Sequence, residues 1–241
     1  MKYVLSYGGG LNSSALLVWL VQNHKPLDLV VFADTGNEHI HTYEAVRYYK
    51  AFAETKGITF ATVRGSLADS VYDYLWQNKI VPSFLRRDCT RYFKVQAIRR
   101  YLRKRFGHKE MFTLYIGVDY GEFHRVRKSD VQYIISDYPL VDNKIDRDGC
   151  KRYLERDGFM VPKKSGCWFC PFQTRDSWRR LQEGNPTLFK QAIALEENTG
   201  RFTMIMGLPL RKLKRQTEGR NSKADDSQSD PPCDVTAGCF L

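Results

Sequence analysis

The fold is decided near the start of the chain, by the stretch Tyr3-Val-Leu-Ser-Tyr-Gly-Gly-Gly-Leu-Asn-Ser-Ser-Ala-Leu-Leu17. An apolar run stops at three consecutive glycines, and hydroxyl residues then open a segment with apolar residues at helical spacing. This order predicts a first strand, a tight turn and a helix N-terminus. Backbone N–H groups at such a turn, together with the positive end of the helix dipole, favour an anion. The stretch therefore predicts a phosphate site, and phosphate indicates a nucleotide.

The residues of this turn supply the contacts that a phosphate needs. Glycine lets the backbone approach an anion closely, and Asn12 or Ser13 is expected to cap the helix. The predicted contacts are Gly8, Gly9, Gly10, Asn12, Ser13 and Ser14. An ordinary glycine-rich turn between a strand and a helix is the alternative, because glycine-rich motifs recur by accident.

Short apolar runs alternate with helical patterns along the first half of the chain. The predicted strands are 3–6, 27–33, 58–63, 113–117 and 132–136. The predicted helices are 13–22, 42–56 and 91–106. This alternation indicates an α/β fold with a parallel twisted sheet and helices on both faces. In such sheets, ligands bind beyond the carboxyl ends of the strands.

Polar residues follow each predicted strand. Asp34-Thr35-Gly36 comes after the second strand, Arg64-Gly-Ser66 after the third, and the segment from Gly117 to Arg125 after the fourth. Because the carboxyl ends of parallel strands meet at one edge of the sheet, these residues are expected to line a common pocket with the glycine turn. Taken singly, each is equally typical of a turn with a capping acid.

The glycine turn resembles the Ser-Gly-Gly-x-Asp-Ser loop of ATP pyrophosphatases and phosphoadenylylsulfate (PAPS) reductases, which aligns with Gly8 to Ser13. Two positions depart from that loop. Gly8 stands where the motif has serine, and Asn12 stands where it has aspartate. Ser6 is the residue expected to replace the lost hydroxyl. The change from aspartate to Asn12 removes a carboxylate and so argues against magnesium binding by this position.

Four further segments resemble the same family in the same order. They are Asp34-Thr-Gly36, Arg87-Asp-Cys-Thr-Arg-Tyr-Phe-Lys94, Gly117 with Glu122 and Arg125, and Lys164-Ser-Gly-Cys-Trp-Phe-Cys-Pro-Phe172. The resemblance implies an adenine nucleotide alpha hydrolase-like fold, ATP or an adenylylated substrate, and Mg²⁺. It also implies that Asp34, Thr35, Gly36, Gly117 and Arg125 contact the nucleotide.

Four cysteines form a candidate metal site. Cys167 and Cys170 make a close pair between Gly166 and Pro171, and Cys89 and Cys150 lie upstream. Four thiolates hold zinc or an iron–sulfur cluster. The resemblance to relatives that deliver sulfur to DNA or tRNA favours a [4Fe-4S] cluster, with Zn²⁺ as the alternative. Free or redox-active thiols are the third reading, and Cys150 alone is equally typical of a buried small hydrophobe.

The last residues differ in composition from the rest. Residues 215–232 are polar and end in two prolines, which is typical of a linker or a disordered tail. Cys233 and Cys239 follow it. Cys239 is a candidate nucleophile, because PAPS reductases carry a nucleophilic cysteine on a mobile C-terminal segment, although their Glu-Cys-Gly motif is absent here. An inert tail is the alternative.

Composition sets the class of protein. With 241 residues and 42% hydrophobic residues the chain can bury a real core, and no apolar run reaches membrane-spanning length. The N-terminus enters the first strand directly, so no signal peptide and a cytoplasmic location are expected. The net charge of +11 indicates a polyanionic partner. Residues 86–109 hold ten Lys or Arg with interleaved aromatics, which suits either a phosphate backbone or a solvated helix face.

These observations predict three regions: an α/β nucleotide-binding domain (1–140), a cysteine-containing helical region packed on it (141–212) and a flexible tail (213–241). The predicted activity is ATP binding, cleavage of the α–β phosphate bond and adenylation of a nucleic acid, DNA or tRNA, for sulfur transfer. Asp34, Ser13 and Cys239 are the predicted catalytic residues, and a cysteine desulfurase is the expected kind of sulfur donor. A sulfonucleotide reductase and a metal-stabilised nucleic-acid-binding protein with a degenerate loop are the alternatives.

Overall fold

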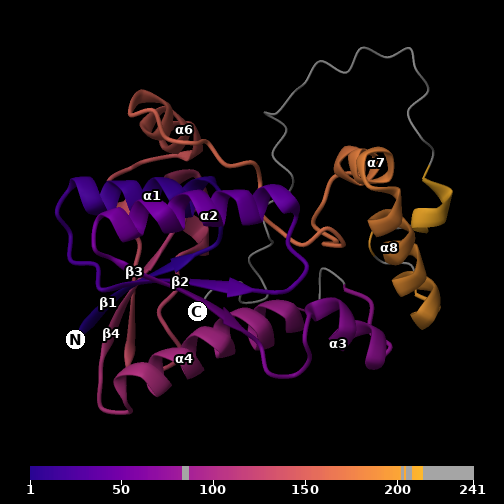
Figure 1. Cartoon of the computed structure of the whole chain (residues 1–241), viewed down its shortest axis with the longest axis horizontal. Coiled ribbons are helices and arrows are strands. Elements are labelled where there is room, and N and C mark those ends of the chain that lie inside the picture. The colour runs from indigo at the N-terminus through magenta and orange to yellow at the C-terminus, as the bar shows by residue number, and fades with distance from the viewer. Residues whose placement is uncertain (83–86, 202–203, 205–207, 214–241) are drawn as a thin grey trace.

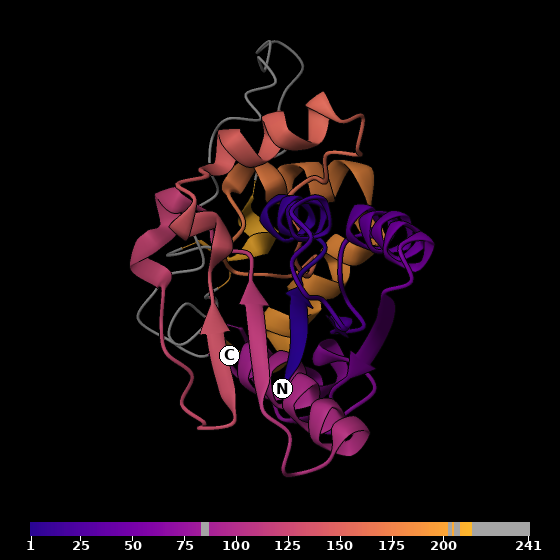
Figure 2. The same ribbon diagram turned by 90° about the vertical axis from the view of Figure 1, so that its left-hand side faces the viewer.

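Five parallel strands form the centre of the structure, a computed structural model that describes residues 1–82, 87–201, 204 and 208–213 (Figure 1). The strands are β1 (Lys2–Tyr7), β2 (Leu29–Asp34), β3 (Thr59–Arg64), β4 (Phe112–Ile116) and β5 (Ile134–Asp137). Their order in the sheet is β3-β2-β1-β4-β5, and every pairing is parallel. Figure 2 shows the arrows of β1, β4 and β5 pointing the same way. The predicted parallel α/β fold is therefore confirmed.

Helices cover both faces of this sheet, as Figure 1 shows. One face carries α1 (Leu11–Gln22) and α2 (Ile40–Thr55), with α6 (Arg147–Arg156) packed on α1; the other carries α4 (Gln96–Phe106). Alternate residues of β1 enter the two cores, with Leu5 packed under α1 and Val4 on the side of α4. All six residues of β2 are buried, as expected for a strand covered on both faces.

A third hydrophobic cluster lies beyond the carboxyl ends of the strands. Its helices are α3 (Val71–Gln77), α7 (Arg175–Gly184), α8 (Pro186–Thr199) and the 3₁₀ turn Leu210–Lys212. Trp178 is fully buried at its centre. Glu196 is buried within it and accepts hydrogen bonds from the amides of Met204 (3.3 Å) and Leu210 (2.9 Å). This cluster positions the cysteine segment described below.

The expected helical region 141–212 divides between two cores. The short helix α5 (Pro139–Asp142) and α6 pack with the sheet, whereas α7 and α8 belong to the third cluster. Except for Leu213, the expected tail 213–241 lies outside the described residues, and so do Cys233 and Cys239. Within the described part of the chain, no helix combines the length and the apolarity that crossing a membrane requires.

The predicted helix 91–106 is wrong in its first half. Residues Cys89–Val95 form a π-helix, and the α-helix begins only at Gln96. The apolar spacing that predicted one helix does not distinguish the two geometries, because the π-helix differs mainly in its i→i+5 hydrogen bonds. Short π-helical segments occur often at functional sites.

Candidate functional site

The glycine turn lies where the strand order reverses, between β1 and β4. Such a switch point is where ligands bind in open α/β sheets. Gly9 has φ +72°, and a Cβ there would lie 2.8 Å from Thr42 Cγ2. At Gly117, which follows β4, a Cβ would lie 2.8 Å from the backbone nitrogen of Ser13. Both positions therefore require glycine, and the turn after β4 packs directly on the first turn of α1.

The N-terminus of α1 is capped by neither residue that the sequence suggested. The helix begins at Leu11, and its capping residue is Gly10, which makes no side-chain capping hydrogen bond. Ser13 Oγ instead closes the turn, because it donates to the carbonyl of Gly10 (3.1 Å) and accepts from the amide of Gly8 (3.2 Å). The first amides of a helix have no intrahelical acceptor, so this end of α1 presents N–H groups to an anion.

Two of the predicted phosphate contacts face elsewhere. Ser14 is fully buried, and its Oγ lies 2.9 Å from the hydroxyl of Tyr7 in a shared hydrogen bond. Burial raises the pKa of Tyr7, so this pair is a neutral part of the core. Ser6 lies on the same face of β1 as Val4, toward α4, because side chains alternate along a strand.

Asn12 binds a carboxylate that sequence reasoning missed. Its Nδ2 donates to Oδ2 of Asp119 at 2.8 Å. Asp119 is 2% exposed, and its Oδ1 accepts from the amide of Glu122 (3.2 Å) at the start of the 3₁₀ turn Tyr120–Arg125. Burial and the charge of Glu122 raise the pKa of Asp119. The available signal was its position directly after β4, two residues beyond Gly117.

Asp34 is held in a network of its own. Its Oδ1 accepts from the amide of Gly36 and the hydroxyl of Tyr43, both at 2.8 Å. Its Oδ2 accepts from Nε (3.0 Å) and Nη2 (2.7 Å) of Arg64. Four donors match the acceptor capacity of a carboxylate. The structure therefore places Asp34 as the residue that fixes the turn after β2, with its oxygens already engaged.

The cysteine segment pairs with the loop after β2. Glu38 and Cys167 form an antiparallel bridge. The amide of His39 donates to the carbonyl of Gly166 (2.9 Å), and that of Trp168 donates to the carbonyl of Asn37 (3.1 Å). Two of the segments that resemble the family, far apart in sequence, are thus joined by backbone hydrogen bonds.

The same segment also covers the glycine turn. A Cβ at Gly10 would lie 2.7 Å from Ser165 Oγ. The residue before Ser165 also contacts this region: the carbonyl of Lys164 lies 2.9 Å from Nε2 of His41, at the start of α2. The cysteine segment therefore contributes Ser165 next to the candidate phosphate site.

An ion pair between a partly exposed lysine and a buried carboxylate lies beneath this segment. Glu38 has a side chain only 1% exposed, and its Oε1 lies 3.2 Å from Nζ of Lys94. Thr35 Oγ1 donates to the same oxygen (3.1 Å) and lies 3.1 Å from Sγ of Cys167. Burial alone would lower the pKa of Lys94, but the charge of Glu38 and the neighbouring thiols raise it overall. Burial, together with Glu38, raises the pKa of Cys167.

The four predicted metal-ligating cysteines do not lie together. Cys89, which opens the π-helix, and Cys167 both interact with the charge of Lys94, and Cys170 follows Cys167 in a tight turn. Cys150 lies on α6 in the core beneath α1, fully buried. No three His, Cys, Asp or Glu side chains of the described residues are grouped as a metal site would require. The residues present therefore do not fit a four-thiolate cluster.

Arg125 and the basic segment are largely occupied by contacts within the protein. Arg125 forms an ion pair with Glu122 inside the turn after β4. On α4, Arg99 pairs with Asp130. Arg103 places its guanidinium 3.4 Å from the ring centroid of Tyr133 and donates to a carbonyl just before β4 (3.1 Å). Several of the charges that suggested a nucleic-acid surface thus stabilise the amino-terminal edge of the sheet.

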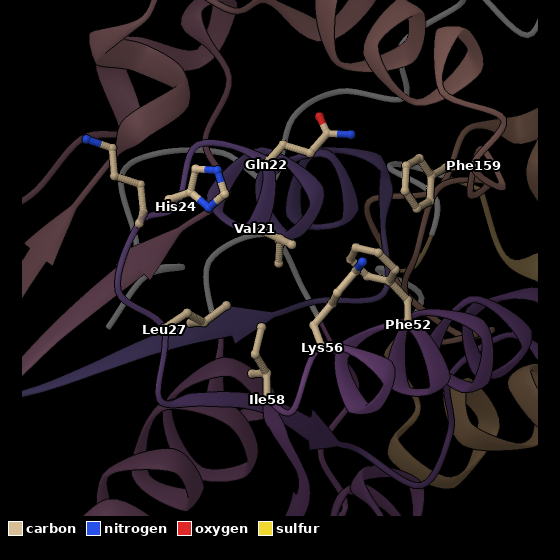
Figure 3. Close-up of a pocket in the computed structure, with 9 residues that line it drawn as sticks. Val21, Gln22, His24, Leu27, Phe52, Lys56, Ile58 and Phe159 are labelled. Atoms are coloured by element: carbon tan, nitrogen blue, oxygen red, sulfur yellow. The ribbon is translucent and has the colours of Figure 1, made fainter.

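A separate depression of about 530 Å³ lies at the amino-terminal edge of the sheet, opposite the glycine turn (Figure 3). Its lining includes Leu27 just before β2 and Ile58 just before β3, together with the ends of α1 and α2. The glycine turn follows the carboxyl end of β1, so this depression is distinct from the candidate phosphate site.

Fold and turn together define a parallel α/β protein with a glycine-rich, anion-accepting helix N-terminus at its switch point. Residues 2–113 match the family model of the phosphoadenosine phosphosulfate reductase domain. No curated protein matches the chain.

Two solved structures align with this chain, and one of them establishes a similar fold. A phosphoadenylyl-sulfate (PAPS) reductase from Candida auris, solved as a phosphate complex, is 18% identical over 70% of this chain and 82% of its own, with a TM-score of 0.51. The U34-tRNA thiolase NcsA from Methanococcus maripaludis, solved with its [4Fe-4S] cluster, is 16% identical over 93% of this chain and 78% of its own. Its TM-score of 0.48 is too low to establish a shared fold.

The contact between β4 and α1 predicts the effect of Gly117→Ala. The added methyl group would meet the Ser13 backbone at 2.8 Å, so one element must shift. Such overpacking costs about 1–3 kcal/mol of unfolding free energy, which thermal denaturation measures. Gly184→Ala is the control, because no atom lies within 4 Å of its Cβ, and its stability should be unchanged or slightly raised. A Gly117→Ala protein as stable as the wild type would contradict the contact.

The burial of Cys150 predicts its reactivity. Burial raises the pKa of this thiol to about 12, so it stays protonated at mildly alkaline pH, and the thiolate is the reactive form. Iodoacetamide should leave Cys150 unmodified in the folded protein and alkylate it after denaturation, as peptide mass spectrometry would show. Rapid labelling of Cys150 in the folded state would contradict this placement.

Proposed function

We propose that this protein binds ATP at the glycine turn, cleaves its α–β phosphate bond and adenylates a nucleic acid for sulfur transfer. The observation that carries the proposal is the N-terminus of α1 at the switch point of the sheet, which has no side-chain cap and follows three consecutive glycines. The match of residues 2–113 to the phosphoadenosine phosphosulfate reductase domain supports an adenine nucleotide as the ligand.

The residues of the turn fit the triphosphate and its cation. Thr42 and Ser165 pack so closely against Gly9 and Gly10 that neither position has space for a side chain, which fixes the backbone of the turn. Oδ1 of Asn12 is buried without a hydrogen-bond partner among the described residues, and an oxygen of this type suits Mg²⁺. Bound ATP would supply pyrophosphate as the leaving group.

The chain's own contribution would be positioning and charge neutralisation. The first amides of α1 would hold the pyrophosphate oxygens, and the turn closed by Ser13 would keep these amides in place. Preorganised donors of this kind stabilise charge that develops during phosphoryl-type transfer. Asp34 would support the site indirectly, through the turn that it fixes.

The proposal that the acceptor is a nucleic acid rests on the positive charge of the protein. The chain carries a net charge of +11, and exposed cations such as Arg100 and Lys104 remain on α4. DNA or tRNA would be the acceptor, with a protein such as a cysteine desulfurase as sulfur donor. A sulfonucleotide reductase is the alternative that the family also supports, and its candidate thiol Cys239 lies outside the described residues.

Replacement of Gly9 tests the nucleotide site. Gly9→Ala should weaken ATP binding at least about tenfold, because the methyl group would enter Thr42 and displace the turn. Gly57→Ala is a matched control, since both glycines have φ +72° but nothing lies near Cβ at Gly57. Isothermal titration calorimetry gives the affinities.

Product analysis separates the candidate activities. Release of pyrophosphate and AMP from ATP in the presence of DNA or tRNA supports adenylation. Sulfite released from PAPS supports the reductase. Salt-dependent nucleic-acid binding without any ATP binding would overturn the proposed function and favour a binding protein.

A metal bound by thiols is a second candidate property, favoured by the proximity of Cys89 and Cys167 to Lys94 and of Cys170 to Cys167. The thiols would have to turn toward a common centre. Anaerobically purified protein should then contain iron or zinc, measured by elemental analysis. Cys167→Ala should lose this metal, whereas Cys150→Ala should keep it. Equal loss from both variants would contradict the three-thiol arrangement.

A further inference from the structure

We propose that Asp119 provides the carboxylate for the divalent cation of the bound nucleotide, and that Asn12 is the neutral partner that orients it. The inference rests on the proposed function, because the cation is the one that accompanies the nucleotide phosphates. In the motif that the turn resembles, the carboxylate is at position 12. Here an amide occupies that position, and a carboxylate from the turn after β4 reaches it.

The orientation of Asn12 follows from its partner. Its Nδ2 lies 2.8 Å from Oδ2 of Asp119. The flipped amide would place oxygen against oxygen, which an ionised carboxylate does not accept. Oδ1 of Asn12 is therefore directed away from Asp119, where it is buried and has no partner among the residues that the structure describes. An amide oxygen and a carboxylate oxygen at adjacent positions are ligands that Mg²⁺ accepts.

Asp119 has acceptor capacity to spare. Two donors reach it, the amide of Asn12 and the backbone of Glu122, whereas an ionised carboxylate offers about four acceptor sites. It is only 2% exposed, so water does not readily supply the rest. A buried carboxylate is costly unless it is paired or coordinates a metal. A phosphate at the helix terminus would add like charge, and a cation between the two groups would remove both costs.

The other carboxylates in the turns after β2 and β4 that the structure pairs are already neutralised. Asp34 receives four donors, two of them from Arg64. Glu38 pairs with Lys94, and Glu122 pairs with Arg125. In the described ranges, by contrast, no ion pair involves Asp119. Beside the glycine turn, Asp119 is therefore the carboxylate that a cation would complete.

The close pair also explains why position 12 is neutral. A carboxylate at position 12 would lie against Asp119, and two such groups cannot both ionise in contact without a large cost. The residues are thus coupled: a carboxylate belongs on one side of the pair and an amide on the other. Exchanging them should preserve the pair, whereas changing one alone should not.

The test compares Asp119→Asn, Asn12→Asp and the double exchange. ATP affinity is measured by calorimetry in Mg²⁺ and in EDTA, and Mn²⁺ bound with ATP is counted by electron paramagnetic resonance. Asp119→Asn should lose about tenfold or more of the affinity gained from Mg²⁺, while its affinity in EDTA stays near that of the wild type. Asn12→Asp should melt earlier without Mg²⁺. The double exchange should recover most of the Mg²⁺-dependent gain.

Asp157→Asn is the matched control. Gln22 Nε2 donates to Asp157 Oδ2 at 2.9 Å, which is the same amide–carboxylate contact at the far end of α1. This variant should bind ATP and Mn²⁺ as the wild type does. Circular dichroism shows that each variant is folded.

The outcomes separate this inference from the proposed function. Full Mg²⁺ dependence in folded Asp119→Asn, or a double exchange no better than Asp119→Asn, overturns the role of Asp119 while ATP binding stands. A wild-type protein that binds no ATP in either buffer overturns both.

Discussion

The backbone contact between Gly117 and the first turn of α1 is the constraint on which the site depends. A Cβ at Gly117 would lie 2.8 Å from the Ser13 nitrogen, closer than packed atoms allow. This approach fixes where the turn after β4 leaves the sheet, and it brings Asp119 within hydrogen-bond distance of Asn12. Because β1 and β4 are neighbours at the switch point, the same contact leaves the helix N-terminus facing the space beyond both strands. Glycine at 117 is therefore a condition for the geometry of the phosphate turn and of the carboxylate beside it.

The site also depends on chain that follows the matched domain. The family match ends at residue 113, yet the antiparallel bridge between Glu38 and Cys167 attaches the third cluster to the loop after β2. Ser165 then closes over Gly10. The sheet positions α1 and the glycine turn, and the segment that precedes α7 covers Gly10. Residues 2–113 on their own would therefore leave the glycine turn uncovered at Gly10.

The sequence predicted the parallel sheet and its carboxyl-end polar residues because these depend on local patterns: apolar runs, helical spacing and glycine at a turn. It predicted the wrong capping residue because Ser13 forms its hydrogen bonds within the turn, to Gly8 and Gly10. It missed the π-helix because its apolar spacing resembles that of an α-helix. The resemblance to the family also grouped Cys150 with three other cysteines, but Cys150 lies in the core with α1 and α6, apart from the cluster of Cys89 and Cys167. Tertiary packing alone decides such cases.

Two aspartates at the same edge of the sheet illustrate how similar residues acquire different chemistry. Asp34 follows β2 and receives four donors, so its oxygens are committed and its turn is rigid. Asp119 follows β4 and receives two, although it is just as buried. The free energy of burying a carboxylate is offset within the protein in the first case and only partly offset in the second. A residue of the second kind is where binding of a cation gains most, because the ligand completes a solvation shell that folding left incomplete.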